Sequence, residues 1–530
     1  MRAFHLDMKL AQYRQDYLAG LFPRLRQAGY DTLVFEIENK VRLDCLGSAV
    51  WCEAYGKAEF AGILGMCREA GLQPIPLIQT SAHLEWLLTH APFQHLREQP
   101  SIAYALCPLK PASRAFLQRY IDEVCEIFGN PDYIHLGGDE ATYMGTCPAC
   151  EAKVKASGKG DYLGEHMGWV AAHALSRGSR PIFWADMVLA HPECLRLFPK
   201  EVVWVDWHYK MTPDGLESTY LWGEKGWPIA APDASAAFRR NYGDYAFQAA
   251  GQRYRPWFYA DYLLDQGFDV LIAPAASCGG DHVFLPSCDR AANVASAALK
   301  VMSEPRLLGS LVTSWAGRMP PLETQWPLLH LPAAIRAQSP GADWQDALRQ
   351  ACRQTFGEDI PDFADHWKAL GESFYLAESH LGMEWESGYV GQMPAIPLLF
   401  AKRLRNKSLD LSAETEKIEA LLAAYAQAAR QLTPFLETPS PTNAAARFWQ
   451  LGVEAIQLRA REYLVYLRAQ GGLFDSPSTT EILWQTEVMA DRWRAALLEV
   501  YQPAGVERAH AVVYGESKRM LPFVCWGRFD

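Results

Sequence analysis

Two adjacent acidic residues, Asp139 and Glu140, are the clearest sign of chemistry in this chain of 530 residues. They end the segment 135–140 (HLGGDE), which follows a short apolar run at Tyr133 and Ile134. Its two glycines permit a tight turn and a close approach of the backbone to a ligand. Adjacent side chains that leave a strand point in different directions, so the two acids can contact different parts of one substrate. This layout predicts that one carboxyl group protonates a leaving oxygen while the other stabilises a nearby charge.

Tryptophans stand near the ends of apolar runs elsewhere in the chain. They are Trp184, Trp204, Trp207 and Trp315. A sugar has apolar C–H faces between its hydroxyl groups, so aromatic walls with polar groups at the rim suit a carbohydrate pocket. Ordinary packing between a sheet and its helices is the alternative for each tryptophan, and both interpretations stand at this stage.

Further polar residues occur where strands are expected to begin or end. Arg2 can bind two sugar hydroxyls with its forked guanidinium, and a solvated surface charge is the alternative. His83 follows an expected strand and can orient a carboxylate, although a lone histidine often has only a structural role. For Asp139 alone, the alternative is a helix N-cap. Four other acids end expected strands, and some of them would only form hydrogen bonds at the rim: Glu36, Glu38, Asp186 and Asp206.

Short apolar runs alternate with helical patterns over roughly the first 335 residues. The strands that we expect cover residues 3–8, 32–37, 74–78, 133–136, 181–184, 202–206, 270–273 and 310–315. Between the first two, Leu18, Leu21 and Leu25 recur at helical spacing, and Gly29 can end that helix. Eight strands alternating with helices predict an α/β fold, the TIM (β/α)8 barrel, with an open doubly wound sheet as the alternative. Active residues of such a barrel follow the C-terminal ends of its strands, where Asp139 and Glu140 would lie.

The strand signal stops near residue 335. Apolar residues then recur at helical spacing over 418–432, 451–463 and 482–497, and the helix-breaking segment 438–443 (TPSPTN) separates the first two stretches. We therefore predict two domains, a catalytic barrel over residues 1–335 and an all-helical C-terminal domain over residues 336–530.

Composition excludes several classes of protein. Because 49% of the residues are hydrophobic, the chain can bury a large core, which argues against disorder. A net charge of -11 argues against nucleic acid or an anionic membrane surface as a partner. The N-terminus does not resemble a signal peptide, and no segment is long and apolar enough to span a membrane, so we expect a cytoplasmic protein. Homo-oligomerisation is compatible with these features.

The chain has 12 cysteines, and their scattered positions suit reduced thiols in a cytosol better than a disulfide framework. The one local cysteine motif is Cys147-Pro148-Ala149-Cys150, just after the acidic pair. A structural zinc site requires about four ligands, and the chain has no second CxxC motif. We therefore expect a tightly packed turn here and no metal, with a metal or redox site as the alternative.

The motifs resemble those of a known family. Segment 135–140 resembles the His-x-Gly-Gly-Asp-Glu signature of family-20 β-N-acetylhexosaminidases. Segments 2–7, 79–83, 184–186 and 313–315 resemble family segments in the expected order, so the likeness spans roughly residues 1–335. It is greatest for the short, intracellular hexosaminidase D-like branch, whose members start directly at the first strand of the barrel.

The resemblance implies a mechanism in which the substrate supplies its own nucleophile. The 2-acetamido oxygen would attack the anomeric carbon and form an oxazolinium intermediate. Glu140 would protonate the departing oxygen and then deprotonate water, while Asp139 would hold the acetamido N–H and stabilise its charge. Two inversions give net retention, and no cofactor is implied. Further substrate-binding residues would be Arg2, at the far side of the ring, and the pocket walls Trp184, Trp207 and Trp315.

Two features depart from the family pattern. Family members carry a tyrosine that binds the acetamido carbonyl after the seventh strand, but segment 275–282 (AASCGGDH) has none, and Tyr209 is our substitute. The acid that binds the distal hydroxyls is also not evident, and Glu323, Asp281 and Asp206 compete for that role. The resemblance therefore implies an exo-acting enzyme on terminal N-acetylhexosamine and leaves the choice between GlcNAc and GalNAc open.

Three other functions compete with this one. A conventional retaining glycosidase would use Glu140 together with a second carboxylate at the barrel end. A non-catalytic sugar-binding protein could keep the barrel without the chemistry, although the intact acidic pair disfavours it. A metal-dependent hydrolase would draw on His5 and Asp7, but no complete ligand set follows from the sequence.

Overall fold

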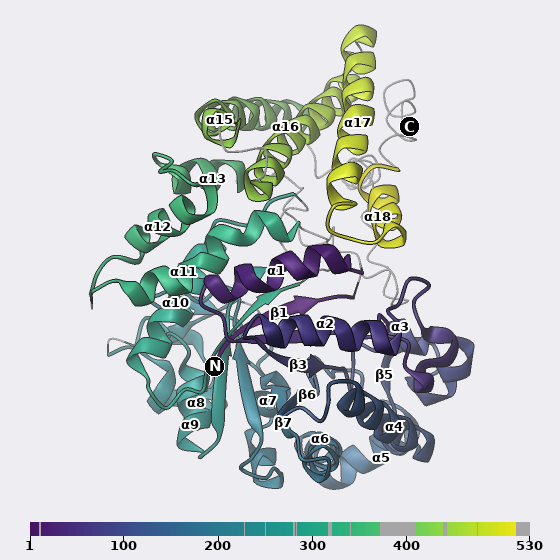
Figure 1. Ribbon diagram of the computed structural model, residues 1–530. Coiled ribbons are helices and arrows are strands. Elements are labelled where there is room, and N and C mark those ends of the chain that lie inside the picture. The colour runs from purple at the N-terminus through teal and green to yellow at the C-terminus, as the bar shows by residue number, and fades with distance from the viewer. Residues whose placement is uncertain are drawn as a thin grey trace.

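Eight parallel strands close into a barrel in the computed structural model (Figure 1). The model describes residues 1–9, 12–226, 228–249, 251–278, 281, 284–315, 321–339, 341–371, 410–437, 443–473 and 475–515. The barrel strands are β1 (Arg2–Asp7), β2 (Thr32–Glu36), β3 (Gln73–Leu77), β6 (Tyr133–His135), β7 (Arg180–Trp184), β8 (Val203–Trp207), β11 (Asp269–Ala273) and β13 (Gly309–Ser314). Pairing of β1 with β13 closes the sheet, so the predicted TIM barrel is confirmed and the open sheet is wrong.

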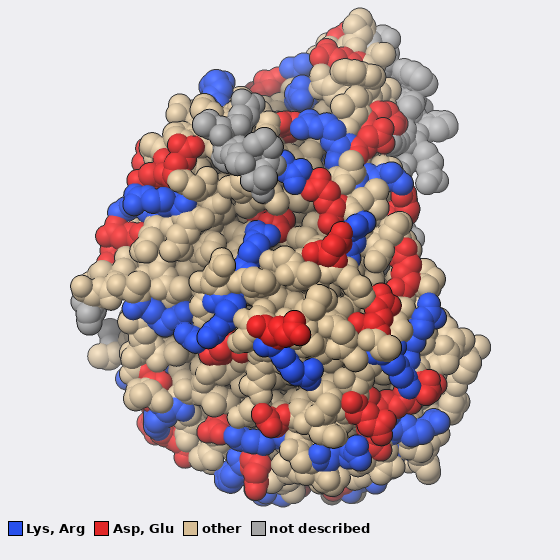
Figure 2. Space-filling view, viewed as in Figure 1, with Lys and Arg blue, Asp and Glu red and all other residues tan. Residues whose placement is uncertain are grey.

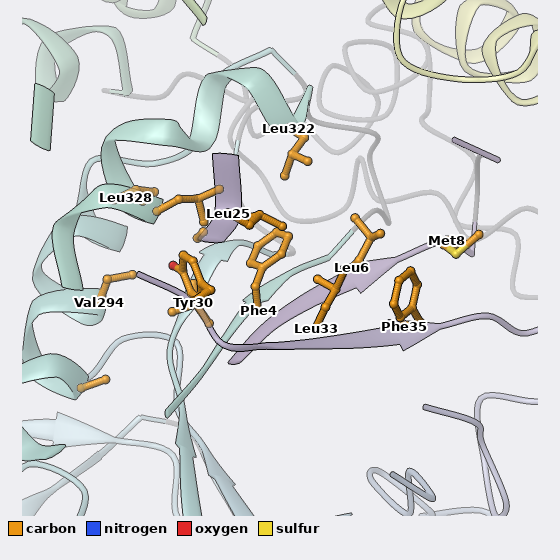
Figure 3. Close-up of a cluster of buried hydrophobic side chains, with 14 of the residues drawn as sticks. Phe4, Leu6, Met8, Leu25, Tyr30, Leu33, Phe35, Val294, Leu322 and Leu328 are labelled. Atoms are coloured by element: carbon orange, nitrogen blue, oxygen red, sulfur yellow. The ribbon is translucent and has the colours of Figure 1, made fainter. Parts of the chain in front are cut away.

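The two faces of each strand carry different parts of the core. In β1, Phe4 and Leu6 point outward and pack with Leu33 and Phe35 of β2 beneath the surrounding helices (Figure 3). Side chains alternate along a strand, so His5 and Asp7 of β1 share the face of Ala3, which belongs to the separate cluster inside the barrel. This alternation decides which residues at the strand ends can face the mouth of the barrel.

Helices surround the barrel, as the alternating pattern predicts (Figure 1). The helices that alternate with the barrel strands include α1 (Gln15–Gln27), α2 (Lys57–Glu69), α4 (Pro111–Ile127), α6 (Lys159–Ser176), α8 (Ala236–Ala246), α9 (Phe258–Asp265), α10 (Asp289–Ser303) and α11 (Trp326–Ala337). In α1 the expected stripe of Leu18, Leu21 and Leu25 is buried, and Pro23 lies inside a helix that continues to Gln27. Gly29 adopts a φ of 94° just after the helix, the left-handed geometry that a C-terminal glycine provides.

Several short elements near the mouth were not predicted from the sequence. A hairpin of β4 (Arg97–Gln99) and β5 (Ile102–Leu106) lies between β3 and α4 in the chain, after the short helix α3 (Glu85–Leu88). The helix α5 (Pro148–Ser157) follows the acidic pair, and α7 (Asp186–Ala190) follows β7. The remaining short strands are β9 (Ser218–Thr219), β10 (Ile229–Ala230) and β12 (Ala275–Ser277).

The region beyond residue 337 is helical in its described parts (Figure 1). Its α-helices are α12 (Trp344–Phe356), α13 (Phe363–Gly371), α15 (Leu411–Glu437), α16 (Ala444–Gln470), α17 (Ser476–Leu497) and α18 (Pro503–His510). The three predicted apolar stripes fall in α15, α16 and α17, and residues 438–442 of the expected breaker lie outside the described residues. Buried side chains of these helices join those of the barrel helices in one apolar cluster.

The surface carries both signs of charge. Basic and acidic side chains are interspersed over the face that Figure 2 shows. Among the described residues, no helix combines the length and the apolar character that crossing a bilayer requires.

Candidate active site

The acidic pair lies in a tight turn at the C-terminal end of β6. Gly137 and Gly138 have φ values of 65° and 94°, in the region that favours glycine. A Cβ atom on Gly137 would collide with the side-chain oxygen of Gln79, and one on Gly138 would lie 2.9 Å from Met167 Cε. The two glycines therefore form the tight turn that the sequence predicted. They also let the backbone pass close to Gln79, which follows β3, and to Met167 of α6. Glu140 itself adopts a φ of 48°.

The two carboxyl groups occupy different environments. Asp139 is buried, whereas the Glu140 side chain is 52% exposed. The His83 ring lies between them, with Nε2 at 3.3 Å from Asp139 Oδ2 and 3.4 Å from Glu140 Oε2. Asp139 Oδ1 has no hydrogen-bond partner within the described part of the chain. One buried acceptor and one accessible acid thus stand side by side at the barrel mouth.

Charge coupling accompanies this geometry. Burial opposes a charged imidazole, but Asp139 and Glu140 outweigh it and raise the pKa of His83 well above its usual value. Burial would likewise raise the pKa of Asp139, but the His83 charge and its hydrogen bond lower it below the usual value. The pair is therefore an imidazolium beside a carboxylate at neutral pH.

Asp186, just after β7, connects the turn after β6 to β8 through hydrogen bonds. Its Oδ2 accepts a hydrogen bond of 2.8 Å from the backbone N–H of Glu140, and its Oδ1 accepts one of 3.3 Å from Trp207 Nε1. Burial, followed by the charge of Asp139, raises the pKa of Asp186 to about 8. A group that is protonated at neutral pH and bonded in this way positions Glu140 and Trp207. This agrees with the sequence-based view that some strand-end acids only form hydrogen bonds at the rim.

Aromatic side chains line the same end of the barrel. The ring centroids of Trp184 and Trp315 are 5.8 Å apart, and those of Trp207 and Tyr209 are 5.0 Å apart. Trp315 Nε1 donates to the Tyr209 hydroxyl at 2.9 Å, which joins the two pairs. The structure also adds Trp222, whose ring lies 4.6 Å from that of Trp207 and which the sequence analysis did not select.

Trp204 belongs to the other face of its strand. It packs against Phe198 and Phe268 in the outer cluster, because it is offset by an odd number of residues from Trp207 in β8. Trp204, unlike Trp184, Trp207 and Trp315, therefore does not face the interior of the barrel. Asp206 shares the Trp204 face, and its carboxylate accepts a bond of 3.1 Å from the backbone N–H of Ala260.

A buried cluster of charged side chains lies at the ends of β1 and β2, and the sequence analysis did not predict that these residues meet. Lys9 Nζ lies 3.1 Å from Glu36 Oε1, 3.5 Å from Asp7 Oδ2 and 4.4 Å from the centre of the Trp315 ring. Burial raises the pKa of Glu38 well above its usual value, whereas Lys9, together with His5, overcomes burial and lowers the pKa of Glu36. The alternation of β1 could have suggested this cluster, since it places Asp7 and His5 inside the barrel.

The same cluster bears on the metal-dependent alternative. His5 Nε2 lies 2.8 Å from Glu36 Oε2. In the described part of the chain, neither His5 nor Asp7 belongs to a group of three side chains that could ligate a metal. The described geometry therefore gives that alternative no ligand set at the barrel mouth.

Two predicted substrate-binding residues are paired with other side chains of the protein. Arg2 lies at the N-terminal start of β1, about 17 Å along the strand from the mouth, and pairs with Asp31 at 2.9 Å while 44% exposed. Glu323 is fully buried, with Arg24 nitrogens at 2.8 Å from each of its oxygens and Tyr17 Oη also at 2.8 Å. Strand direction explains the position of Arg2, and an ion pair with Arg24 of α1 explains that of Glu323.

Asp281, the third candidate for the distal hydroxyls, is also paired within the protein. Its Oδ1 lies 2.9 Å from a terminal nitrogen of the buried Arg290. Residues 279, 280 and 282 of the segment in which the tyrosine was sought lie outside the described residues. All three acids that the sequence suggested for the distal hydroxyls are thus bonded to other groups of the protein.

Comparison with known proteins confirms the predicted resemblance. Residues 33–229 match the model of the glycosyl hydrolase family 20 catalytic domain. Human hexosaminidase D is 32% identical over 198 residues, which are 36% of this chain and 41% of that protein. Bovine hexosaminidase D is 31% identical over 198 residues, 36% of this chain and 57% of that protein. The aligned part thus spans about half the length of these relatives.

Solved structures give similar matches. The β-N-acetylhexosaminidase from Bacteroides fragilis has 17% identity and a TM-score of 0.46, over 67% of this chain and 69% of that chain. The chitobiase from Flavobacterium johnsoniae has 14% identity and a TM-score of 0.48, over 98% of this chain and 78% of that chain.

Proposed function

We propose that this chain, whose residues 33–229 match the catalytic domain of glycosyl hydrolase family 20, is an exo-β-N-acetylhexosaminidase. It removes terminal β-linked GalNAc or GlcNAc with retention, through an oxazolinium intermediate formed by the substrate's own acetamido group. The observation that carries the proposal is the placing of buried Asp139 and accessible Glu140 around His83 at the end of β6.

Glu140 is the general acid and then the general base. Its side chain is half exposed, so the glycosidic oxygen and later a water molecule can reach it. Its backbone N–H is fixed by Asp186 at 2.8 Å, which limits the directions that the side chain can take. As the aglycone leaves, the proton moves from the carboxyl group to the glycosidic oxygen, and the resulting carboxylate takes a proton from the incoming water.

Asp139 orients the nucleophile. Its carboxylate is ionised by the neighbouring imidazolium of His83, and its Oδ1 has no other hydrogen-bond partner among the described residues. That oxygen can accept the acetamido N–H, so the amide oxygen turns toward the anomeric carbon. The negative charge then stabilises the positive charge that spreads over the oxazolinium ring.

Aromatic residues complete the pocket. Trp184, Trp207 and Trp315 wall the sugar ring, because they come from the ends of three barrel strands and share the interior side of the barrel, where the Trp184 and Trp315 rings are 5.8 Å apart. The Tyr209 hydroxyl accepts the Trp315 N–H at 2.9 Å, which leaves its own proton to donate to the acetamido carbonyl. Tyr209 therefore remains our substitute for the family tyrosine.

The conventional retaining alternative needs an ionised second carboxylate as nucleophile. Asp186 is near Glu140, but it is bonded to backbone and indole N–H groups and has a pKa of about 8. It is therefore poorly suited to attack the anomeric carbon. No second carboxylate is needed when the substrate supplies the nucleophile.

The predicted barrel domain over residues 1–335 carries this chemistry, and the described helices of the predicted C-terminal domain, residues 336–530, pack against it. The protein acts in the cytosol, where the thiols that are free in the described structure would persist. Its substrate is a small molecule or glycoconjugate that ends in N-acetylhexosamine.

Two measurements test the proposal. Aryl β-N-acetylglucosaminide and aryl β-N-acetylgalactosaminide are assayed side by side, and a thiazoline that mimics the oxazolinium is added to each. We expect hydrolysis of at least one substrate and competitive inhibition by the thiazoline. Hydrolysis without inhibition would favour the conventional glycosidase, and binding of the sugar without hydrolysis would favour a sugar-binding protein.

A further inference from the structure

Four metal-ligating side chains meet beside the loop that carries the acidic pair. Glu98 of β4 and Cys107, just after β5, approach Cys147 and Cys150 at the start of α5. One ligand atom from each of these four residues lies within 4.8 Å of the other three. The sequence analysis found the CxxC pair and no partner for it, because its partners come from a hairpin about forty residues earlier in the chain.

The spacing of these atoms suits one tetrahedral ion. Cys107 Sγ lies 3.4 Å from Cys150 Sγ and 3.9 Å from Cys147 Sγ, and Cys150 Sγ lies 3.5 Å from Glu98 Oε2. Zinc–sulfur bonds of about 2.3 Å at tetrahedral angles give S···S distances of about 3.8 Å. A disulfide requires about 2.05 Å between sulfurs, so the thiols are gathered without being bonded.

Glu98 is held with one oxygen directed at the cysteines. Its Oε1 accepts the backbone N–H groups of Thr146 and Cys147 at 2.8 and 3.0 Å, which fixes the carboxylate plane. Its Oε2 is the atom that faces Cys150. A buried carboxylate is costly unless it is paired or binds a cation. The charge of Lys159 acts on Glu98 and Cys150, but its ammonium group donates to the carbonyl oxygen of Met144 and forms no ion pair with Glu98.

We propose that Glu98, Cys107, Cys147 and Cys150 bind a structural zinc ion. Four protein ligands close the coordination sphere, which is the arrangement of a structural rather than a catalytic zinc site. Three soft thiolates select zinc over magnesium or calcium, and the single carboxylate is a ligand that zinc also accepts. This replaces the packed turn that we expected from the sequence.

The ion would fasten the acidic loop to the β4–β5 hairpin. Tyr104 of β5 lies between the hairpin ligands, and its hydroxyl lies 3.2 Å from both His83 Nε2 and the carbonyl oxygen of Glu140. The loop from Glu140 to Cys147 is thus held at one end by Tyr104 and Asp186 and at the other by the metal. The site stabilises the geometry of the acidic pair without touching substrate.

Metal analysis of the full-length protein, purified without chelators from zinc-supplemented cells, tests the proposal first. We expect one zinc per chain by atomic emission. Replacement of zinc by Co²⁺ should give the sulfur-to-cobalt charge-transfer absorption of a thiolate site. These measurements do not depend on hydrolase activity, so their outcome is independent of whether the proposed function is correct.

Two variants and a control locate the site. Cys150→Ser should lose stoichiometric zinc. Glu98→Gln keeps an oxygen for the two backbone N–H bonds but loses the ligating oxygen, so it should fold and bind zinc at least about tenfold more weakly in competition with a chromophoric chelator. Cys67→Ser removes a buried thiol of α2 that is not part of the cluster, and its zinc content should be unchanged.

Three results would overturn the proposal. The first is a substoichiometric zinc content in the purified protein with no uptake of Zn²⁺ or Co²⁺ after reduction. The second is a Cys107–Cys150 or Cys147–Cys150 disulfide in the mass spectrum of protein that was never exposed to an oxidant. The third is full zinc affinity in a folded Glu98→Gln variant.

Discussion

At the scale of single residues, the site gives two neighbouring carboxyl groups different environments. Asp139 is buried against the imidazolium of His83, while Glu140 extends into a half-exposed position on a strained backbone. The His83 charge lowers the pKa of Asp139 below its usual value, and the exposure of Glu140 leaves its carboxyl group open to substrate and solvent. The division of labour between acid and stabiliser thus follows from position in the turn.

Replacing Glu140 by glutamine removes the proton donor and leaves the shape of the site. We expect kcat/KM for a substrate with a poor leaving group to fall by about 10²–10⁴. An activated aryl substrate should be affected less, because its leaving group needs little protonation. Steady-state kinetics with both substrates measure this, and Glu151→Gln, an exposed acid on α5, is the control. Equal activity of Glu140→Gln and wild type on the poor substrate would remove Glu140 from the acid role.

Replacing His83 by asparagine tests the charge coupling. Asparagine tolerates the left-handed backbone at this position, where φ is 54°. The imidazolium holds the pKa of Asp139 below its usual value, so its loss raises that pKa, and the carboxylate is protonated at a higher pH. The acidic limb of the kcat/KM profile should therefore move to higher pH, by about 1–3 units.

The control for this change is His173→Asn, which removes a histidine paired with Asp122 away from the site. Its acidic limb should coincide with that of the wild type. An unshifted limb in His83→Asn would mean that Asp139 does not depend on His83 for its ionisation.

Three residues of the site could be placed from the sequence, and two others could not. Asp139, Glu140 and His83 could be placed together because each lies in the segment that follows a strand of the barrel. Arg2 and Glu323 could not, since their positions depend on the direction of β1 and on an ion pair between α1 and the turn before α11. A charge that looks available in the sequence can be neutralised by a residue hundreds of positions away.

At the scale of elements, the barrel strands could be predicted from the sequence, but the short hairpin and helices around the mouth of the barrel could not. All eight predicted strands agree with the structure to within one residue at each end. Strands of a parallel barrel are covered on both faces, so they read as short continuous apolar runs. The β4–β5 hairpin and the short helices α3, α5 and α7 leave no such signal, because they are held by side-chain contacts around the mouth.

The turn after β6 makes a prediction about its glycines. Gly137→Ala adds a methyl group that collides with Gln79 and also strains a backbone with φ of 65°. Gly178→Ala is the matched control, since its φ is 83° but nothing lies within 4 Å of the added Cβ. We expect the control to cost about 1–2 kcal/mol for the left-handed backbone.

Gly137→Ala should cost that amount plus about 1–3 kcal/mol for the overlap. Urea unfolding of both variants measures the difference in free energy of unfolding, and the hydrolase assay reports whether the acidic pair has moved. Equal stability losses in the two variants would mean that Gln79 does not constrain the turn.

At the scale of the whole molecule, the helical region is packed onto the barrel through α16. Trp449 of α16 is fully buried, and its Nε1 donates to the carbonyl oxygen of Thr324 at 2.9 Å, just before α11. Its ring lies 5.0 Å from Phe363 and 5.3 Å from Trp367 of α13. The sequence predicted the helices from their apolar stripes, but the partner of each stripe could not be read from spacing alone, and the domain boundary near residue 335 remains a prediction.

This packing predicts that the barrel and the helices unfold together. Trp449→Ala should lower the free energy of unfolding by about 3–5 kcal/mol, the cost of emptying a large aromatic site. The control is Trp484→Ala on α17, whose side chain is 65% exposed and whose loss should change stability by no more than about 0.5 kcal/mol. Helical circular dichroism and hydrolase activity are followed in the same urea series, and for Trp449→Ala both midpoints should fall by the same amount. The helices around the barrel contribute to the same signal, so a loss of only part of it at a urea concentration that leaves activity intact would report unfolding of the C-terminal helices alone. That result would show that the barrel is stable without them and that Trp449 does not join the two parts into one cooperative unit.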